Sequence, residues 1–83
     1  MVDDEPGNRT LCRMVLEPEG MVFDEAADGI QGLRITTWGN YDLVLLDIDM
    51  PGMQGTEVLR QLRMNPPCPH LKIIMMSGRA TGD

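Results

Sequence analysis

The sequence predicts an α/β domain built on a parallel sheet, and three observations support this fold class. Short apolar runs, each about as long as one strand, recur along the 83 residues. Segments in which apolar residues are spaced as on a helix separate these runs. The most apolar run, Leu43–Leu46, has no polar alternation, which is typical of a strand buried on both faces of a parallel sheet. Strands that alternate with helices indicate right-handed crossovers between parallel strands.

Length and composition restrict the possible classes. A chain of 83 residues provides one domain, which we take to span residues 1–83. The net charge of -6 argues against nucleic acid or an anionic membrane as a direct partner. No apolar run approaches the roughly 18 residues of a membrane span, and no signal-peptide pattern opens the sequence. We therefore expect a cytoplasmic protein.

The first predicted helix follows an apolar stub, Met1-Val2, which is too short to form a strand alone. Residues 4–6, Asp-Glu-Pro, lie at the start of this helix, where acidic residues and proline are favoured. Pro18 and Gly20 end it. One face of the helix carries the apolar residues Leu11, Met14 and Val15.

The second strand is predicted over the apolar run Met21–Phe23. Asp28-Gly29 marks a turn into the second helix, and Gly39-Asn40 ends that helix. The residues that share one face of the second helix are Ile30 and Leu33, with Thr37 one turn further on.

The third strand, Asp42–Asp47, is predicted to be the most buried. The turn Met50-Pro51-Gly52 stops it, because proline has no N–H for the ladder and glycine favours a tight reversal. A third helix is predicted over Thr56–Arg63, and a fourth strand over Leu71–Met76 after a proline-rich loop. The residues of the third helix expected to face inward are Val58, Leu59 and Leu62.

Polar side chains follow three of these strands: Asp3-Asp4 the first, Asp47 the third and Ser77 the fourth. The carboxyl ends of parallel strands share one edge of a sheet, so the carboxylates can converge there. Converging carboxylates repel, and must take up a proton or hold a cation. Carboxylates with a backbone carbonyl and water usually hold Mg²⁺. Beside such an ion, Asp47 can attack a phosphoryl group as a nucleophile and Ser77 can donate a hydrogen bond to it.

Five segments resemble the response-regulator receiver domain in their order and spacing. They are Val2–Pro6, Ala27–Gly29, Tyr41–Asp47, Met50–Gly55 and Ile74–Gly78. The resemblance covers almost the whole chain and implies a flavodoxin-like parallel sheet with flanking helices and strand order 2-1-3-4-5. The sequence would supply about four strands and three helices of this fold, with the last strand and helices missing.

The resemblance also implies roles for individual residues. Asp47 would accept phosphate from a sensor histidine kinase or phosphotransfer protein, and Ser77 would contact the phosphoryl group. Asp3 and Asp4 would bind Mg²⁺ with Asp47, and the backbone carbonyl of Asp49 would complete the protein ligands. Such a domain is a phosphoacceptor rather than an enzyme with a separate substrate.

Two alternative functions stay open, and the first depends on departures from the family pattern. The phosphate-pairing lysine of the family's fifth strand is absent, and Lys72 begins the fourth strand, at the opposite edge from Asp47. In the first alternative, the chain is a phosphorylation-impaired, truncated receiver that acts as an oligomeric assembly module. The uncovered edge of the fourth strand, or a segment swap, then joins copies into a homo-oligomer. The other alternative is a haloacid-dehalogenase-like phosphatase fragment, whose opening motif resembles residues 45–49, although Pro51 fits that motif poorly.

Local readings of the site residues also stay open. Asp3-Asp4-Glu5 is compatible with a role confined to the start of a helix, and Ser77 with ordinary turn chemistry. The side chain of Asp49 is expected to be a solvated turn residue. A shared site requires the carboxylates of Asp3 and Asp4 to lie close to that of Asp47. A role confined to a helix start does not require this.

Overall fold

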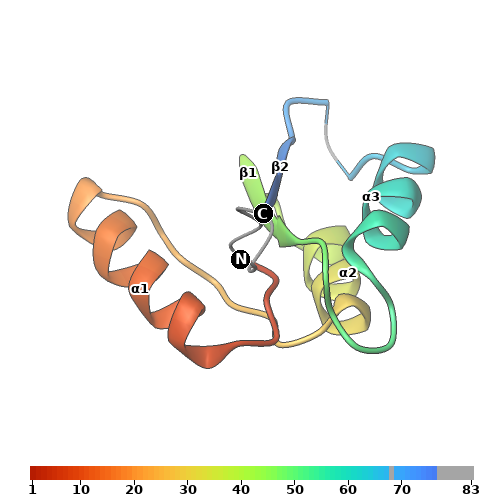
Figure 1. The fold of residues 1–83 in the computed structure, drawn as a ribbon. Coiled ribbons are helices and arrows are strands. Elements are labelled where there is room, and N and C mark those ends of the chain that lie inside the picture. The colour runs from red at the N-terminus through yellow and green to blue at the C-terminus, as the bar shows by residue number, and fades with distance from the viewer. Residues whose placement is uncertain (68, 77–83) are drawn as a thin grey trace.

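The computed structural model describes residues 1–67 and 69–76 of the chain. This part contains three α-helices, a short 3-10 helix and two strands, and Figure 1 shows their arrangement. In chain order the elements are α1 (Pro6–Leu16), the short 3-10 helix η1 (Glu17–Glu19), α2 (Gly29–Trp38), β1 (Leu43–Asp47), α3 (Gly55–Met64) and β2 (Lys72–Met76).

The sheet is parallel, as predicted. β1 and β2 pair in a register that runs from Leu43 opposite Lys72 to Asp47 opposite Met76. On the other side of β1, Val2 forms parallel bridges with both Leu46 and Ala26. The spatial order is therefore the Ala26 segment, the Val2 segment, β1 and β2. The Val2 segment, which comes first in the chain, lies between the Ala26 segment and β1, and this arrangement confirms the predicted α/β fold.

The first two strand segments of the sheet each consist of a single bridging residue, Val2 and Ala26. The prediction of a strand over Met21–Phe23 is wrong, since the pairing lies at Ala26 instead. The N–H of Ala26 donates to the carbonyl oxygen of Met1 (2.9 Å). The N–H of Asp3 donates to the carbonyl oxygen of Ala26 (3.0 Å), so Ala26 lies opposite Val2, whereas Val22 is 91% exposed.

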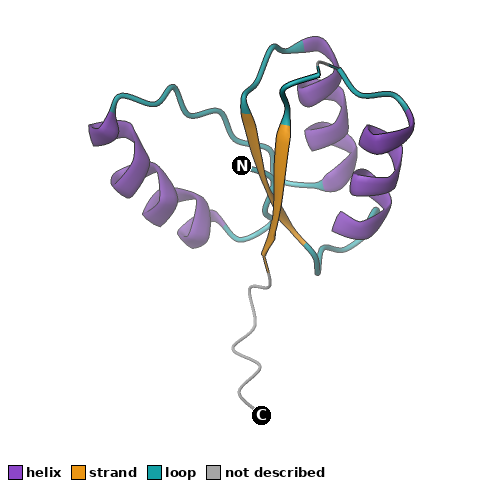
Figure 2. Ribbon diagram, turned by 90° about the horizontal axis from the view of Figure 1, so that it is seen from above, coloured by secondary structure: helices purple, strands orange, loops and turns teal. Residues whose placement is uncertain are grey.

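Helices lie on both faces of the strands. Figure 2 shows α1 on one side, and α2 and α3 on the other. The core lies on the α2 and α3 side, where Val44 and Leu46 of β1 are buried together with Val58 and Leu62 of α3, two residues predicted to face inward. By contrast, α1 buries no residue, and its predicted apolar face stays between 62% and 66% exposed at Leu11, Met14 and Val15.

The buried face of α2 differs from the predicted one. Its buried residues are Gly29, Gly32 and Thr36. Of the predicted face, Leu33 is partly buried and packs against the core, whereas Ile30 is 57% exposed and Thr37 is also exposed. A Cβ atom on Gly32 would lie 2.6 Å from both Cγ atoms of Val2. Small residues therefore face the sheet because α2 approaches the Val2 bridge too closely for a larger side chain.

The turn after β1 brings α3 against the strand end. Gly52 has a φ of +79°, a conformation that glycine adopts without strain, and it follows Pro51 in the predicted turn. The N–H of Gly55 then donates to the carbonyl oxygen of Ile48 (3.0 Å). A Cβ atom on Gly55 would lie 2.0 Å from the carbonyl oxygen of Asp47, so this helix start must lack a side chain.

We predict that Gly55→Ala destabilises the domain by about 1–3 kcal/mol, the usual cost of overpacking a site bounded by backbone. Urea unfolding followed by circular dichroism measures this change. The matched control is Gly7→Ala in α1, where a Cβ atom would meet nothing within 4 Å. That control should be neutral or stabilising by up to about 1 kcal/mol, because alanine is the better helix former. Equal effects of the two substitutions would contradict the close approach.

Tyr41 lies two residues before β1, and its side chain contacts the segment that leads to Ala26. Its hydroxyl donates to Oδ2 of Asp24 (2.5 Å). This hydrogen bond, with smaller contributions from burial and from the charge of Asp24, raises the pKa of Tyr41 from 10.0 to about 12. Because the pKa is higher in the folded state, this hydrogen bond stabilises the fold fully below the ordinary tyrosine pKa. Its contribution to the free energy of unfolding is lost as the pH rises from about 10 to about 12.

Tyr41 is the single tyrosine of the chain, so its ionisation can be followed by ultraviolet absorbance. We predict a titration midpoint near 12 for the wild type and a midpoint closer to 10.0 for Asp24→Asn, which removes the negative acceptor. Circular dichroism at each pH verifies that the chain is still folded. Identical midpoints in two folded proteins would show that Asp24 does not hold the phenol.

Candidate functional site

Three carboxylates meet at the carboxyl edge of the sheet. Asp3 follows the Val2 bridge, and Asp47 is the last residue of β1. The N–H of Asp47 donates to the carbonyl oxygen of Val2 (2.9 Å), which holds the two chain segments side by side. Asp3, Asp4 and Asp47 each offer one carboxylate oxygen within 4.8 Å of the others. The structure thus brings together the three acidic side chains that the sequence analysis placed at one edge.

Two of these carboxylates are almost completely buried. Asp3 is 2% and Asp47 is 3% exposed, while Asp4 is partly exposed. The carboxylate of Asp3 accepts hydrogen bonds from the N–H of Glu5 (2.9 Å) and from Nδ2 of Asn8 (3.2 Å). Oδ1 of Asp47 accepts one from the N–H of Asp49 (3.2 Å). A carboxylate has about four acceptor positions, so the two hydrogen bonds of Asp3 orient this group and leave positions for a further ligand.

The charge of this cluster calls for a cation. Among the ion pairs of the described residues, none includes Asp3 or Asp4. Arg9 approaches Asp3 but donates to its backbone carbonyl oxygen (2.7 Å). Carboxylates this close repel unless one is protonated or an ion lies between them. A compact set of anionic oxygen donors suits Mg²⁺, so the residues present fit the predicted ion.

The other predicted site residues have different outcomes. Asp49 has an exposed side chain, as expected of a turn residue, and the role of its carbonyl oxygen stays a prediction. Ser77 lies outside the described residues. Lys72 pairs with Leu43 at one end of the sheet, while Asp47 pairs with Met76 at the other. The prediction that Lys72 cannot serve the site is therefore confirmed.

Three supporting residues were not singled out from the sequence. Asn8 holds the carboxylate of Asp3, Arg9 holds its carbonyl oxygen, and Gly55 allows α3 to approach Asp47. Asn8 and Arg9 lie in the first turns of the helix that follows the acidic doublet, and Gly55 follows the Met-Pro-Gly turn. The sequence signal that could have identified these residues was therefore their position close to the predicted site residues along the chain.

Within the described ranges, no helix has both the length and the apolar character needed to cross a bilayer. This finding agrees with the short apolar runs of the sequence.

Comparison with known proteins gives a consistent result. The family model "Response regulator receiver domain" matches residues 1–83. The transcriptional regulatory protein ResD of Bacillus subtilis is 44% identical over 79 residues, which are 95% of this chain and 32% of ResD. This chain therefore spans about a third of that relative's length.

Two solved structures show the same fold. The response regulator TrrA of Thermotoga maritima, in complex with Mg²⁺-BeF, has a TM-score of 0.86 and 42% identity, over 95% of this chain and 67% of TrrA. TrrA in complex with the histidine kinase ThkA has a TM-score of 0.82 and 40% identity, over 99% of this chain and 71% of that one.

The family match removes the haloacid-dehalogenase-like phosphatase from consideration, because it accounts for the whole chain and for the amino-terminal acidic doublet together. The parallel sheet, the three converging carboxylates and the solved relatives point the same way. The chain belongs to the response regulator receiver domain family, and is a phosphoacceptor domain of two-component signalling rather than a catalytic enzyme.

Proposed function

We propose that Asp47 is the residue that becomes phosphorylated, and that Asp3, Asp4 and Asp47 hold the Mg²⁺ that this reaction needs. The observation that carries the proposal is the convergence of three carboxylates, two of them buried, at the carboxyl edge of the sheet. The complex of the relative TrrA with Mg²⁺-BeF supports it. A bound magnesium ion would offset the negative charge of an incoming phosphoryl group and orient it.

The protein supplies the nucleophile and its orientation. An oxygen of the Asp47 carboxylate attacks phosphorus, the bond from phosphorus to the donor breaks, and an acyl phosphate forms. The hydrogen bond from the N–H of Asp49 to Oδ1 of Asp47 limits rotation of the carboxylate. The carbonyl oxygen of Asp49 is proposed as a further magnesium ligand, and Ser77 as a contact of the phosphoryl group.

A histidine kinase, or a phosphotransfer protein carrying phosphohistidine, is the proposed phosphodonor. TrrA has been solved in complex with the histidine kinase ThkA, and this chain matches TrrA in that complex over 99% of its length. Transfer from such a donor breaks a phosphorus–nitrogen bond, and the released imidazole takes up a proton. The proposal requires Asp47 to be accessible to the phosphorylated histidine once the ion has bound.

We predict that the wild-type chain gains one phosphoryl group when incubated with Mg²⁺ and acetyl phosphate, and that Asp47→Asn gains none, because the amide is not a nucleophile. Intact-mass spectrometry measures both. The matched control is Asp42→Asn, which removes an exposed carboxylate just before the start of β1, at the opposite end of the strand from Asp47, and should leave phosphorylation unchanged. Omission of Mg²⁺ should abolish uptake by the wild type. Lack of uptake by the wild type, or equal uptake by Asp47→Asn, would contradict the assignment.

A second candidate function, homo-oligomeric assembly, is favoured by the exposed edge of β2. Among the described residues β2 pairs on one side alone, with β1, and Ile74 is 50% exposed. Unpaired N–H and C=O groups along a strand are a template for pairing with another chain. We propose that a second copy adds its own strand at this edge, which extends the sheet across the two molecules.

Light scattering after size-exclusion chromatography tests this proposal. We predict that the wild type forms dimers or larger species as concentration rises, and that Ile74→Lys shifts the population to monomer, because a charged edge resists strand pairing. The control is Val22→Lys, which changes an equally apolar side chain, 91% exposed, away from that edge and should not alter assembly. A wild type that stays monomeric at every concentration would exclude pairing.

A further inference from the structure

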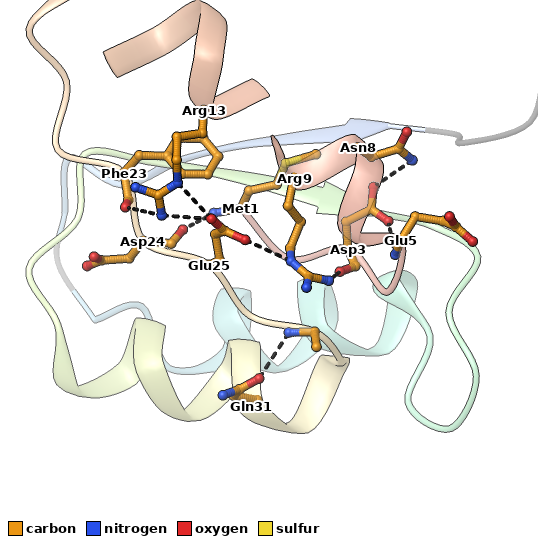
Figure 3. A network of polar contacts seen from close by, with 11 residues as sticks. Met1, Asp3, Glu5, Asn8, Arg9, Arg13, Phe23, Asp24, Glu25 and Gln31 are labelled. Carbon is orange, nitrogen blue, oxygen red and sulfur yellow. Dashed lines mark hydrogen bonds and ion pairs between the residues drawn. The ribbon is translucent and has the colours of Figure 1, made fainter. Parts of the chain in front are cut away.

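Asp3 is held by its backbone as well as by its carboxylate. Its N–H donates to the carbonyl oxygen of Ala26 (3.0 Å), and its own carbonyl oxygen accepts from Nη1 of Arg9 (2.7 Å). Figure 3 shows Arg9 between Asp3 and Glu25. The residue that leads into the acidic cluster is therefore fixed from two directions.

Glu25 completes this arrangement. Nε of Arg9 donates to Oε1 of Glu25 (2.9 Å), and Glu25 directly precedes Ala26, the acceptor for Asp3. The contacts form a closed ring that runs from Asp3 to Arg9, Glu25, Ala26 and back to Asp3. The side chains of Arg9 and Glu25 are 17% and 29% exposed, so the ion pair is largely shielded from water, where charge-assisted hydrogen bonds are stronger.

Arg13 contacts the same glutamate without reaching the site. Its Nε donates to Oε2 of Glu25 (2.7 Å), its Nη2 donates to the carbonyl oxygen of Phe23 (3.0 Å), and its guanidinium lies 5.0 Å from the centre of the Phe23 ring. Hydrogen bonds from Arg13 and Arg9 lower the pKa of Glu25, which keeps it ionised. Arg13 therefore anchors α1, a helix that buries no residue, whereas Arg9 is the one of these two arginines that extends to Asp3.

We propose that Arg9, held in place by Glu25, is a positioning residue of the cation site. The carbonyl oxygen that Arg9 binds belongs to the peptide joining Asp3 to Asp4, and a peptide unit is planar. Fixing this oxygen therefore fixes the direction in which the chain continues to Asp4. The inference rests on the proposed function, since it concerns how the two acidic residues present their carboxylates to Mg²⁺.

Charge and positioning predict opposite effects of removing Arg9. A cationic side chain near a metal site repels the ion, so its removal, judged by charge alone, strengthens Mg²⁺ binding. Loss of a group that orients a ligand weakens binding. The sign of the change in affinity therefore separates the two roles.

Isothermal titration calorimetry with MgCl₂ on the whole chain is the test. We predict about tenfold weaker binding for Arg9→Ala, at the low end of the range for partners outside the ligands themselves. Arg9→Lys keeps the charge but can donate along fewer directions, and should lie between Arg9→Ala and the wild type. The matched control is Arg13→Ala, which removes the other arginine bound to Glu25 and should change affinity by less than about twofold.

Each outcome has a defined meaning. Circular dichroism and urea unfolding identify variants that are still folded, and Arg9→Lys carries the test if Arg9→Ala does not fold. Folded Arg9 variants that bind Mg²⁺ as tightly as the wild type, or more tightly, would overturn the inference. So would an Arg13→Ala variant as weak as Arg9→Ala, because anchoring of α1 would then explain both. A wild type that binds no Mg²⁺ would instead overturn the proposed function itself, and this inference with it.

Discussion

The parallel pairing of Val2 is the interaction on which the rest of the structure depends. Its N–H donates to the carbonyl oxygen of Leu45 (2.8 Å), and its carbonyl oxygen accepts from the N–H of Asp47 (2.9 Å). The same residue bridges Ala26 on its other side and packs against Gly32 of α2. One buried residue thus joins β1, α2 and the Ala26 segment, and the next residue along the chain is the first acidic ligand candidate.

The site combines close packing with a large concentration of negative charge. Three glycines permit the packing: Gly32 against Val2, Gly29 against Met53, and Gly55 against the carbonyl of Asp47. Each of these close approaches leaves no room for a side chain. At Gly55, the lack of a Cβ atom allows the start of α3 to lie against the backbone of Asp47. The carboxylates themselves repel, and their hydrogen bonds to Glu5, Asn8 and Asp49 offset part of that repulsion. The carboxylate cluster is therefore maintained at a cost in stability.

The sequence predicted the elements that follow from local pattern and missed those that depend on contacts between distant segments. The inward residues Val58 and Leu62 and the convergence of Asp3, Asp4 and Asp47 followed from helical spacing and from strand ends. The second strand was misplaced because its position depends on what lies opposite it. The buried face of α2 was missed because glycine carries no apolar signal, although Gly32 lies directly against Val2. The bond between Arg9 and Glu25 joins residues 16 positions apart, which no periodicity reports.

The burial of Asp3 and Asp47 side by side links the stability of the fold to the composition of the solution. In the unfolded chain these residues are separated by 43 intervening positions and form no common pocket. A ligand that binds the folded state alone shifts the folding equilibrium toward that state, by an amount that grows with its free concentration. A divalent ion held by these carboxylates would thus act as a folding cofactor, and its chelation would lower the melting temperature of the domain without altering a single covalent bond.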